Sequence, residues 1–355
     1  MIKQIWKDGF ARISLIVLLI LYVLILCADF IAPYSKNYSN RDLAYVPPSK
    51  IYVINQQGRF SFPYTYNYTR QYVPELMQTV YIEDKTTKYF VKPLVFGSEY
   101  KILGLLPCKI HLFGVEPGGN IHLLGTDING RDVFSRLLFG GRISMTVGFL
   151  ALFILFPIGL IYGGISGYFG GKTDIIMMRF AEAIMAIPSF YLLIILAAIL
   201  PPGMTSATRF GLIVVILALI GWAGFARVVR GMVLSIKNED FVLAAKTIGA
   251  SSLRIITRHI LPQATSYVII AMTLSVPSYI LSESGLSFLG LGIQQPDASW
   301  GNMLKEAQEF TNLIYRPWLL APGVLIFIAV LSFNVLGDTI RDILDPKGRK
   351  REQLR

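Results

Sequence analysis

The sequence predicts an all-α integral membrane protein with about six transmembrane helices and a small extracytoplasmic insertion between the first two. Of its 355 residues, 54% are hydrophobic and only 15% are charged, whereas soluble domains carry about 25% charged residues. The apolar residues gather in six runs, each long enough to cross a hydrocarbon core of about 30 Å as a helix. The formal net charge of +11 is typical of a protein that holds Lys and Arg against the cytoplasmic leaflet, and we do not expect nucleic-acid binding.

The first predicted span runs from Ile13 to Ala32. Lys3, Lys7 and Arg12 precede it as in a signal peptide, but the apolar run is too long and lacks a good cleavage site. We therefore expect residues 1–32 to be a cytoplasmic N-terminus followed by a retained helix. Because lipid offers backbone groups no hydrogen-bonding partner, the remaining apolar runs should also be helices. These five predicted spans cover residues 143–169, 175–200, 210–226, 264–281 and 318–337.

Prolines lie within three of these spans and favour kinks in them. They are Pro157, Pro188 and Pro277.

Lys and Arg near the span ends predict the orientation of the chain in the membrane. With the N-terminus placed in the cytoplasm, the inside loop 227–262 and the tail 341–355 each carry six basic residues. The short outside loops carry only Arg209, Lys305 and Arg316. Both termini are therefore predicted to be cytoplasmic, with residues 125–340 as the transmembrane core and 341–355 as a basic tail.

The segment 33–124 is then predicted to lie outside the cytoplasm. It holds eleven of the eighteen tyrosines of the chain. Stretches such as 50–54 and 89–95 are rich in β-branched and aromatic residues, and Gly and Pro occur between them. A small β-rich domain and an ordered long loop both fit this composition.

The predicted cytoplasmic loop 227–262 is the most informative part of the sequence. Asn238 can act as the N-cap of a short helix, and Glu239 and Asp240 suit its first turn. One face of this helix would present residues with helical spacing, namely Phe241, Ala244, Ala245 and Ile248. The small alanine surface would fit a groove in a partner protein, and a helix lying on lipid fits the same periodicity.

Polar and special residues predict how this helix ends. Gly249 can end it in the left-handed conformation, and Ser251 or Ser252 can cap a second short helix. Pro262 is expected to separate that second helix from the next span. The loop is thus predicted to be a helix, a glycine turn and a second helix.

This loop is similar to the cytoplasmic signature of permease subunits of binding-protein-dependent ABC importers. The signature reads Glu-Ala-Ala, three residues, Gly, nine residues, Ile, one residue, Leu-Pro. Leu243 stands where Glu is usual and His259 where Ile is usual, so the resemblance does not extend to the polar contact that Glu would make with the ATPase. The matching positions are Ala244, Ala245, Gly249, Leu261 and Pro262.

Three further stretches resemble the C-type permease of dipeptide and oligopeptide importers. They are residues 125–138, 282–302 and 317–346, in the order expected of that family. The resemblance is close over 125–346 and loose over the first span, while the insertion 33–124 is longer than in typical members.

The resemblance implies a translocation subunit that is not itself an enzyme. It would pair with a second, related permease, with two cytoplasmic ATPases that bind ATP and Mg²⁺, and with an external solute-binding protein that delivers peptide. This chain would bind no cofactor and no metal of its own, and it would lie in the bacterial inner membrane. The residues implied to couple to the ATPase are Asp240, Phe241, Ala244, Ala245, Lys246, Gly249, Arg258, His259 and Pro262.

A second set of residues is expected near a gate or pore. Arg179 and Glu182 are spaced to form an ion pair within the third span, which fits either a gate or a structural contact. Family segments similar to 285–293 form a scoop-like element near the external gate, and an interfacial loop fits these residues equally well. The candidates after the fifth span are Ser282, Glu283, Gly285, Phe288 and Gly290.

Other functions stay open at this stage. Relatives of this branch carry nickel or other small solutes, so the substrate class is not fixed. A self-sufficient secondary transporter would call for internal repeats and intramembrane carboxylates, of which the sequence gives little sign. A membrane enzyme would need a clustered catalytic set, and His111, His122 and His259 are far apart in the sequence.

Overall fold

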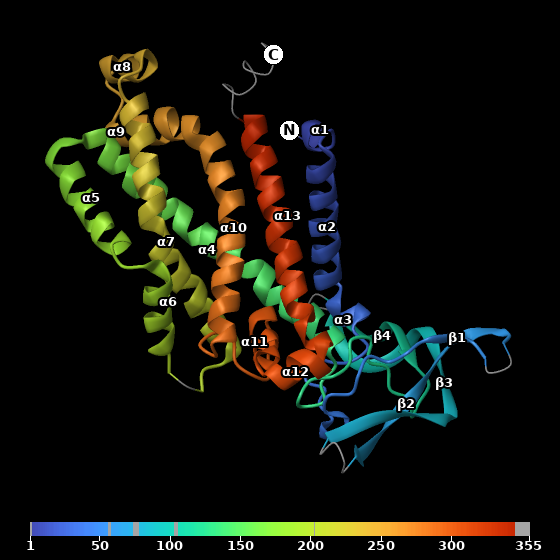
Figure 1. The fold of residues 1–355 in the computed structure, drawn as a ribbon. Coiled ribbons are helices and arrows are strands. Elements are labelled where there is room, and N and C mark those ends of the chain that lie inside the picture. The colour runs from blue at the N-terminus through green and yellow to red at the C-terminus, as the bar shows by residue number, and fades with distance from the viewer. Residues whose placement is uncertain (1, 56–57, 74–77, 103–105, 202, 345–355) are drawn as a thin grey trace. The chain divides into compact units, whose positions relative to one another are not determined.

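The computed structural model describes residues 2–55, 58–73, 78–102, 106–201 and 203–344 as a set of helices with one antiparallel sheet (Figure 1). Five helical stretches in this part of the chain are long and apolar enough to cross a membrane, and one bent pair gives a sixth. The prediction of an all-α membrane protein with about six spans and an inserted segment is confirmed. The long helices are α2 (Gly9–Leu26), α4 (Val133–Phe169), α7 (Ser206–Ile236), α10 (Thr265–Phe288) and α13 (Ala321–Leu344).

The chain divides into two compact units. The first unit consists of Met1–Leu18, Met145–Leu286 and Phe327–Arg355. The second unit consists of Leu19–Ser144 and Ser287–Ile326. The short helical elements outside the long spans are α1 (Ile2–Ile5), α3 (Ala28–Ile31), η1 (Arg41–Leu43), α11 (Trp300–Leu304), η5 (Lys305–Gln308), α12 (Phe310–Tyr315) and η6 (Pro317–Leu320).

Several helices extend beyond the apolar runs that predicted them. The predicted span 210–226 is part of α7, which continues to Ile236, and the predicted span 143–169 is part of α4, which begins at Val133. The additional turns carry polar and basic side chains, such as Arg136 and Arg230. Hydropathy reports only the part of a helix that suits lipid, so it underestimates helices that continue into the interface.

The third predicted span, 175–200, is broken at its middle. It consists of α5 (Gly171–Met185) and α6 (Ser189–Ala198), which meet at an angle of 74°. Pro188 occupies the N-cap of α6, where its ring disfavours a helical residue before it and its missing N–H costs nothing. The kink predicted at Pro188 is therefore a full break, whereas α4 and α10 continue as helices through Pro157 and Pro277.

Glycines bring α4 and α7 into backbone contact in the first unit. A Cβ atom on Gly163 would lie 2.4 Å from the carbonyl oxygen of Ala226, and one on Gly167 would lie 2.8 Å from that of Arg230. The two glycines are four residues apart, so they share one face of α4. Small residues with this spacing let spanning helices approach closely, and they fix α4 against α7.

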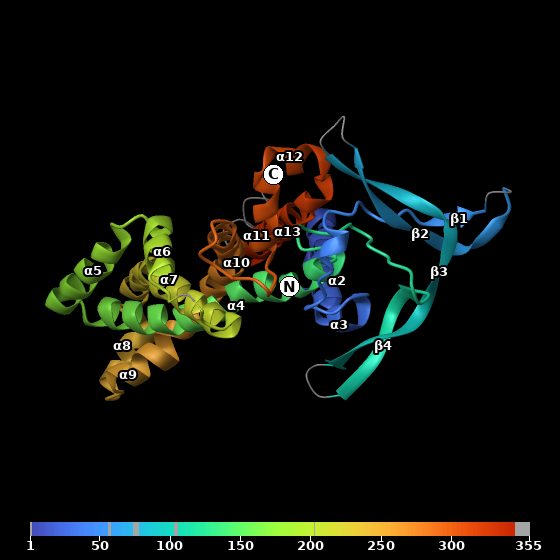
Figure 2. The same ribbon diagram turned by 90° about the horizontal axis from the view of Figure 1, so that it is seen from below.

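The inserted segment of the second unit forms a four-stranded antiparallel sheet, which decides between the two readings of residues 33–124 in favour of a β-rich one. The strands follow chain order and lie side by side in that order. The long strand β3 pairs with β2 through its first half and with β4 through its second half (Figure 2). The strands are β1 (Tyr52–Ile54), β2 (Phe60–Val73), β3 (Gln78–Ile102) and β4 (Leu106–Val115).

Aromatic packing explains part of the tyrosine content of this sheet. Tyr64 and Tyr66 are buried, and their rings contact each other and the ring of Tyr52 at centroid distances of 5.6 Å. Rings in this range attract one another beyond the apolar area that they bury.

Hydrogen bonds join the segment before the sheet to the segment after it. Val46 accepts a bond from the N–H of Thr126 at 2.9 Å, and His122 accepts one from the N–H of Ser49 at 2.8 Å. The N–H of Tyr45 donates to the carbonyl oxygen of Asp127 at 3.0 Å. The sheet is thus closed at its base by its own flanking residues.

Candidate functional site

The loop 238–262 folds as a helix, a glycine turn and a second helix, as predicted. The first helix is α8 (Asp240–Thr247), and Gly249 follows it with φ +79°. The N–H of Gly249 donates to the carbonyl oxygen of Lys246, and that of Ala250 donates to the carbonyl oxygen of Ala245, both at 3.0 Å. These two bonds satisfy the last carbonyls of the helix in the arrangement that favours glycine. Figure 1 shows α8 and the following helix α9 (Ser252–Ile255) beyond the end of α7.

Two details of this prediction are wrong. The N-cap of α8 is Glu239, not Asn238, and its side chain makes no cap bond, so the helix begins one residue later than expected. Pro262 does not separate the second helix from the next span. Instead α9 continues through the π-turn η3 (Ile256–Ile260) and the 3₁₀ turn η4 (Leu261–Ala264) into α10. Pro262 lies in the first turn of η4, where a helical residue does not need its N–H.

Ser251 caps the second helix, which decides between the two predicted capping residues, Ser251 and Ser252. Its Oγ accepts a bond from the N–H of Arg254 at 3.4 Å.

Three of the four residues of the face predicted to meet a partner are exposed, and one is buried. Val242 is fully buried and Ala245 is 4% exposed, and α8 contacts α9 and η3. Phe241 is 41% exposed and Ile248 is 85% exposed. The inward direction thus passes between Val242 and Ala245, about a quarter turn from the predicted stripe. Of that stripe, Ala245 points inward, while Phe241, Ala244 and Ile248 are exposed.

We define the coupling surface as the exposed apolar side chains of α8 and α9, namely Phe241, Leu243, Ile248 and Leu253. Leu243, which replaces the usual Glu of the signature, belongs to this surface, so its position is open to a partner. His259 is half-buried in the π-turn. The other predicted coupling residues are exposed, namely Asp240, Lys246, Gly249, Arg258 and Pro262.

A carboxylate close to the junction of α7 and α8 ties three helices together. Asp174 in the first turn of α5 accepts hydrogen bonds from Ser166 Oγ on α4 and from Arg230 Nε on α7, both at 2.6 Å. Its second oxygen accepts a bond from Arg230 Nη2 at 2.5 Å. Two parallel bonds of this kind fix orientation as well as distance. We call Ser166, Asp174 and Arg230 the brace.

The sequence carries one signal for the brace. Asp174 is an acidic residue at the edge of a predicted span, and such residues point to a paired partner. The position of Arg230 in a basic loop predicts orientation in the membrane but does not identify it as the partner of Asp174.

A cavity of about 210 Å³ lies between α6, α7 and α10 in the first unit. Three serines of α10 with helical spacing, Ser275, Ser278 and Ser282, supply hydroxyl groups to its wall. The hydroxyl of Ser275 donates to the carbonyl oxygen of Ala271 at 2.6 Å, so its oxygen can still accept a bond from a ligand. The remaining lining residues are Ser189, Phe190, Leu193, Leu217, Ile220, Gly221 and Tyr279.

The predicted gate residues fall into different environments. Arg179 Nη1 donates to Glu182 Oε2 at 3.0 Å as an exposed pair within α5, and Ser282 lines the cavity. Glu283 is fully buried, and α10 remains helical as far as Phe288. The segment 285–293 therefore begins as helix and turns only afterwards, at Gly290 with φ +81°. Gly285 lies in the helical part, where an added Cβ would lie 3.5 Å from the ring of Phe190.

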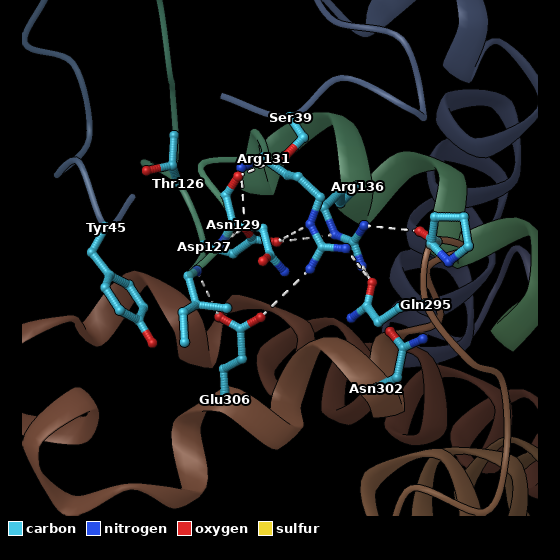
Figure 3. A network of polar contacts seen from close by, with 12 residues as sticks. Ser39, Tyr45, Thr126, Asp127, Asn129, Arg131, Arg136, Gln295, Asn302 and Glu306 are labelled. Atoms are coloured by element: carbon cyan, nitrogen blue, oxygen red, sulfur yellow. Dashed lines mark hydrogen bonds and ion pairs between the residues drawn. The ribbon is translucent and has the colours of Figure 1, made fainter. Parts of the chain in front are cut away.

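A buried polar network occupies the second unit (Figure 3). Asp127 Oδ2 accepts a hydrogen bond from Arg131 Nε at 2.6 Å and lies 3.5 Å from Arg136 Nε. Both guanidinium groups donate to the side-chain oxygen of Gln295, toward which they point in Figure 3. The network therefore links the start of α4 and the residues before it to the segment before α11.

Glu306 completes this network from the turn η5. Its Oε2 accepts a bond from the N–H of Ile128 at 3.1 Å, and its Oε1 lies 3.7 Å from Arg131 Nη2. Burial raises the pKa of Glu306 from an ordinary value near 4.5 to about 7, and repulsion from Asp127 adds to the shift. The sequence marked 125–138 only by resemblance and gave no indication of this chemistry.

Two family models match the chain. Residues 144–350 match the family described as "Binding-protein-dependent transport system inner membrane component". Residues 1–48 match the "N-terminal TM domain of oligopeptide transport permease C". The four strands lie between these two ranges.

Curated relatives share substantial sequence identity with the chain. The dipeptide transport system permease protein DppC of Bacillus subtilis is 47% identical over 231 residues, which cover 64% of this chain and 70% of that protein. The oligopeptide transport system permease protein OppC of Bacillus subtilis is 44% identical over 66% of this chain and 75% of that protein. The glutathione transport system permease protein GsiD of Pectobacterium atrosepticum is 38% identical over 65% of this chain and 75% of that protein.

A solved structure of the MetNI methionine ABC transporter in inward-facing conformations resembles this chain with a TM-score of 0.44 and 18% identity. The likeness covers 59% of this chain and 96% of that one.

Proposed function

The chain belongs to the family of binding-protein-dependent transport system inner membrane components, and from this premise we propose that it carries dipeptides or oligopeptides across the bacterial inner membrane. It is a multi-pass permease subunit of an ABC importer, and ATP hydrolysis belongs to a separate subunit. Its partners include such an ATPase and a solute-binding protein. We further propose that it pairs with a second, related permease above two ATPases, with both termini cytoplasmic and ATP and Mg²⁺ bound by the ATPases alone.

The substrate class rests on the relatives. Their names concern dipeptides, oligopeptides and glutathione, which is itself a tripeptide, and they give no support to nickel or to ion-driven transport. The cavity of the first unit supports the same class, because neutral hydroxyl groups suit peptide amides of any sequence. We propose that Ser275, Ser278 and Ser282 line part of the peptide path.

The coupling surface carries the proposal for how the ATPase engages. An eight-residue helix whose inner side is fixed by Val242 and Ala245 presents Phe241 and Ile248 outward. Exposed large apolar side chains on a rigid helix are typical of a contact site for another protein. We propose that α8 fits a groove of the ATPase, and that Asp240, Lys246, Gly249, Arg258 and Pro262 lie around that contact.

Cross-linking tests this contact. With Cys27 and Cys108 replaced by serine, a cysteine introduced as Ile248→Cys is expected to cross-link to the ATPase in the complete complex in native membranes. Ala245→Cys on the same helix is the matched control, because Ala245 is only 4% exposed and should react poorly. Capture of lipid or of this chain alone at Ile248, in a sample that contains the assembled complex, would overturn the proposed docking.

Uptake tests the function as a whole. The complex of both permeases, the ATPases and the binding protein, reconstituted in proteoliposomes, should accumulate a labelled dipeptide only when ATP is supplied on the ATPase side. Uptake driven by an ion gradient without ATP would contradict the proposal.

A further inference from the structure

The brace joins helices that the proposed function leaves unconnected. The ends of α4 and α7 are already held together by backbone contact at Gly163 and Gly167. α5 packs against α7, and among the described residues the ion pair of Asp174 with Arg230 joins the two helices. The Asp174 side chain is 12% exposed and that of Arg230 is 33% exposed, so the pair is partly shielded from solvent.

The helix α8 is held close to the brace on two sides. Only Lys237 to Glu239 separate it from α7, and Lys237 Nζ donates to the carbonyl oxygen of Gly167 at 3.1 Å. The ammonium group of Lys246 lies 5.3 Å from the ring centroid of Tyr168 on α4. A displacement of α8 must therefore displace the adjoining ends of α4 and α7.

The other end of α5 leads to the cavity. After the 74° break at Pro188 the chain continues as α6, from which Ser189, Phe190 and Leu193 line the cavity. α6 also packs directly against α7, so motion of α7 can reach this wall both through that packing and through α5, and the brace governs the path through α5.

We propose that the pair of Asp174 and Arg230 is a positioning element that makes α5 follow α7 when the coupling helix moves. The inference rests on the proposed function, because it assumes that α8 receives the motion of an ATPase. With the pair intact, a movement of α8 reaches the α6 wall of the cavity. With the pair broken, α7 and α8 still move and ATP is still hydrolysed, but α5 no longer carries the motion to the wall. Hydrolysis then proceeds with much less transport per ATP.

The test measures ATP hydrolysis and dipeptide uptake in the same proteoliposomes with the complete complex. Asp174→Asn and Arg230→Gln are each expected to keep hydrolysis within about twofold of the native rate while lowering uptake per ATP about tenfold, a size usual for coupling between sites. Lys172→Gln is the matched control. It removes a charge from the same turn of α5, and Lys172 is exposed and makes no ion pair with the described residues. This control should keep the native ratio of peptide uptake to ATP hydrolysis.

Rescue distinguishes positioning from simple loss of structure. Arg230→Lys keeps the charge but only one of the two bonds, and it is expected to give an intermediate ratio of uptake to hydrolysis. The exchange Asp174→Arg with Arg230→Asp restores a pair of opposite charges and should recover at least part of the ratio. If Asp174→Asn does not assemble, Arg230→Lys decides the question, and a native ratio in that variant overturns the proposal.

The outcomes separate this inference from the proposed function. If the native complex neither hydrolyses ATP nor takes up peptide, the proposed function fails. The inference alone fails in two cases in which the native complex transports normally. In the first, the variants keep the native ratio of uptake to hydrolysis. In the second, they lose hydrolysis and uptake together.

Discussion

The coupling surface of α8 and the network around Arg131 distribute polar and apolar groups in opposite ways. α8 exposes Phe241 and Ile248 and covers little of its apolar area within the chain. The network buries Arg131 and Asp127 and gives each charge a partner of opposite sign. A charge can be buried only when neighbouring groups compensate it, whereas exposed apolar area gains stability only when something covers it. One region is therefore complete within the chain, and the other leaves apolar area uncovered, as the proposed docking to an ATPase requires.

The largest effect is expected from placing a charge on the coupling surface. Ile248→Asp should weaken ATPase binding about a hundredfold, because a central apolar contact contributes about 2–4 kcal/mol and a buried carboxylate adds a further cost. Titration of the purified ATPase against the permease pair in nanodiscs measures this change. Phe60→Asp, at an exposed position on β2, should leave the affinity unchanged. If Ile248→Asp bound the ATPase with native affinity, the exposed apolar side chains of α8 would not be a contact site, and the proposed contrast with the buried network would fail.

Breaking the buried network is expected to cost stability instead of affinity. Arg131→Met leaves Asp127 and Glu306 buried without their closest cation, and such losses cost about 3 kcal/mol. The thermal midpoint of the solubilised chain should fall by roughly 4 °C. Lys92→Gln removes an exposed ion pair with Glu116 and should leave the midpoint unchanged. Equal thermal midpoints for the two variants would show that the buried network does not contribute to the stability of the folded chain.

The network should also make stability depend on pH. The pKa of Glu306 is raised to about 7 in the folded chain, so the folded state holds its proton more tightly than the unfolded state. This contribution is complete below the ordinary pKa of a glutamate and disappears as pH rises through 7, which amounts to about 2 kcal/mol between roughly pH 5.5 and 8. Midpoints measured across this range should fall with rising pH.

A variant of Glu306 isolates this group from the other acids and bases. Glu306→Gln imitates the protonated form, so the fall in midpoint with pH should become shallower in this variant. An unchanged slope would assign the pH dependence elsewhere.

The smallest expected effect concerns the turn after α8. Gly249→Ala places a side chain at φ +79°, which costs about 1 kcal/mol, although the surrounding space is open. Amide hydrogen exchange in α8 should accelerate about fivefold. Gly231→Ala on α7 is the control, because its surroundings are equally open and its φ is ordinary, so it should not accelerate exchange. Equal behaviour of the two variants would show that the turn does not hold α8.

Local chemistry made the coupling loop predictable from the sequence. Gly249 and Ser251 act on hydrogen bonds to residues at most five positions away, and both predictions are confirmed. The prediction for Pro262 was wrong because a π-turn and a 3₁₀ turn accommodate the ring without ending the helix. Of the face expected to meet a partner, Phe241, Ala244 and Ile248 are exposed, but Ala245 is covered, because α8 packs on α9 and η3 through Val242 and Ala245.

Contacts between distant residues were beyond the sequence. Arg131 and Gln295 are 164 positions apart, and Asp174 and Arg230 are 56 apart. Each of these side chains is charged or polar near an apolar run, which indicates a partner but does not identify it. The partner follows only from the packing of the helices. Composition alone likewise left a sheet and an ordered loop as equal readings of 33–124, and the pairing of β3 with two neighbours decided between them.

Residues 45–49 and 122–127 are hydrogen-bonded to one another, so the polypeptide leaves the helical part of the protein and rejoins it at nearly one place. The strands also pack against α3, where His111 Nδ1 of β4 lies 2.7 Å from the carbonyl oxygen of Ala32. The first family-matched range ends within residues 45–49, at residue 48. A short glycine-serine bridge in place of the strands is therefore expected to leave hydrogen exchange in α7 and α10 unchanged and to accelerate it in α3, which loses its cover.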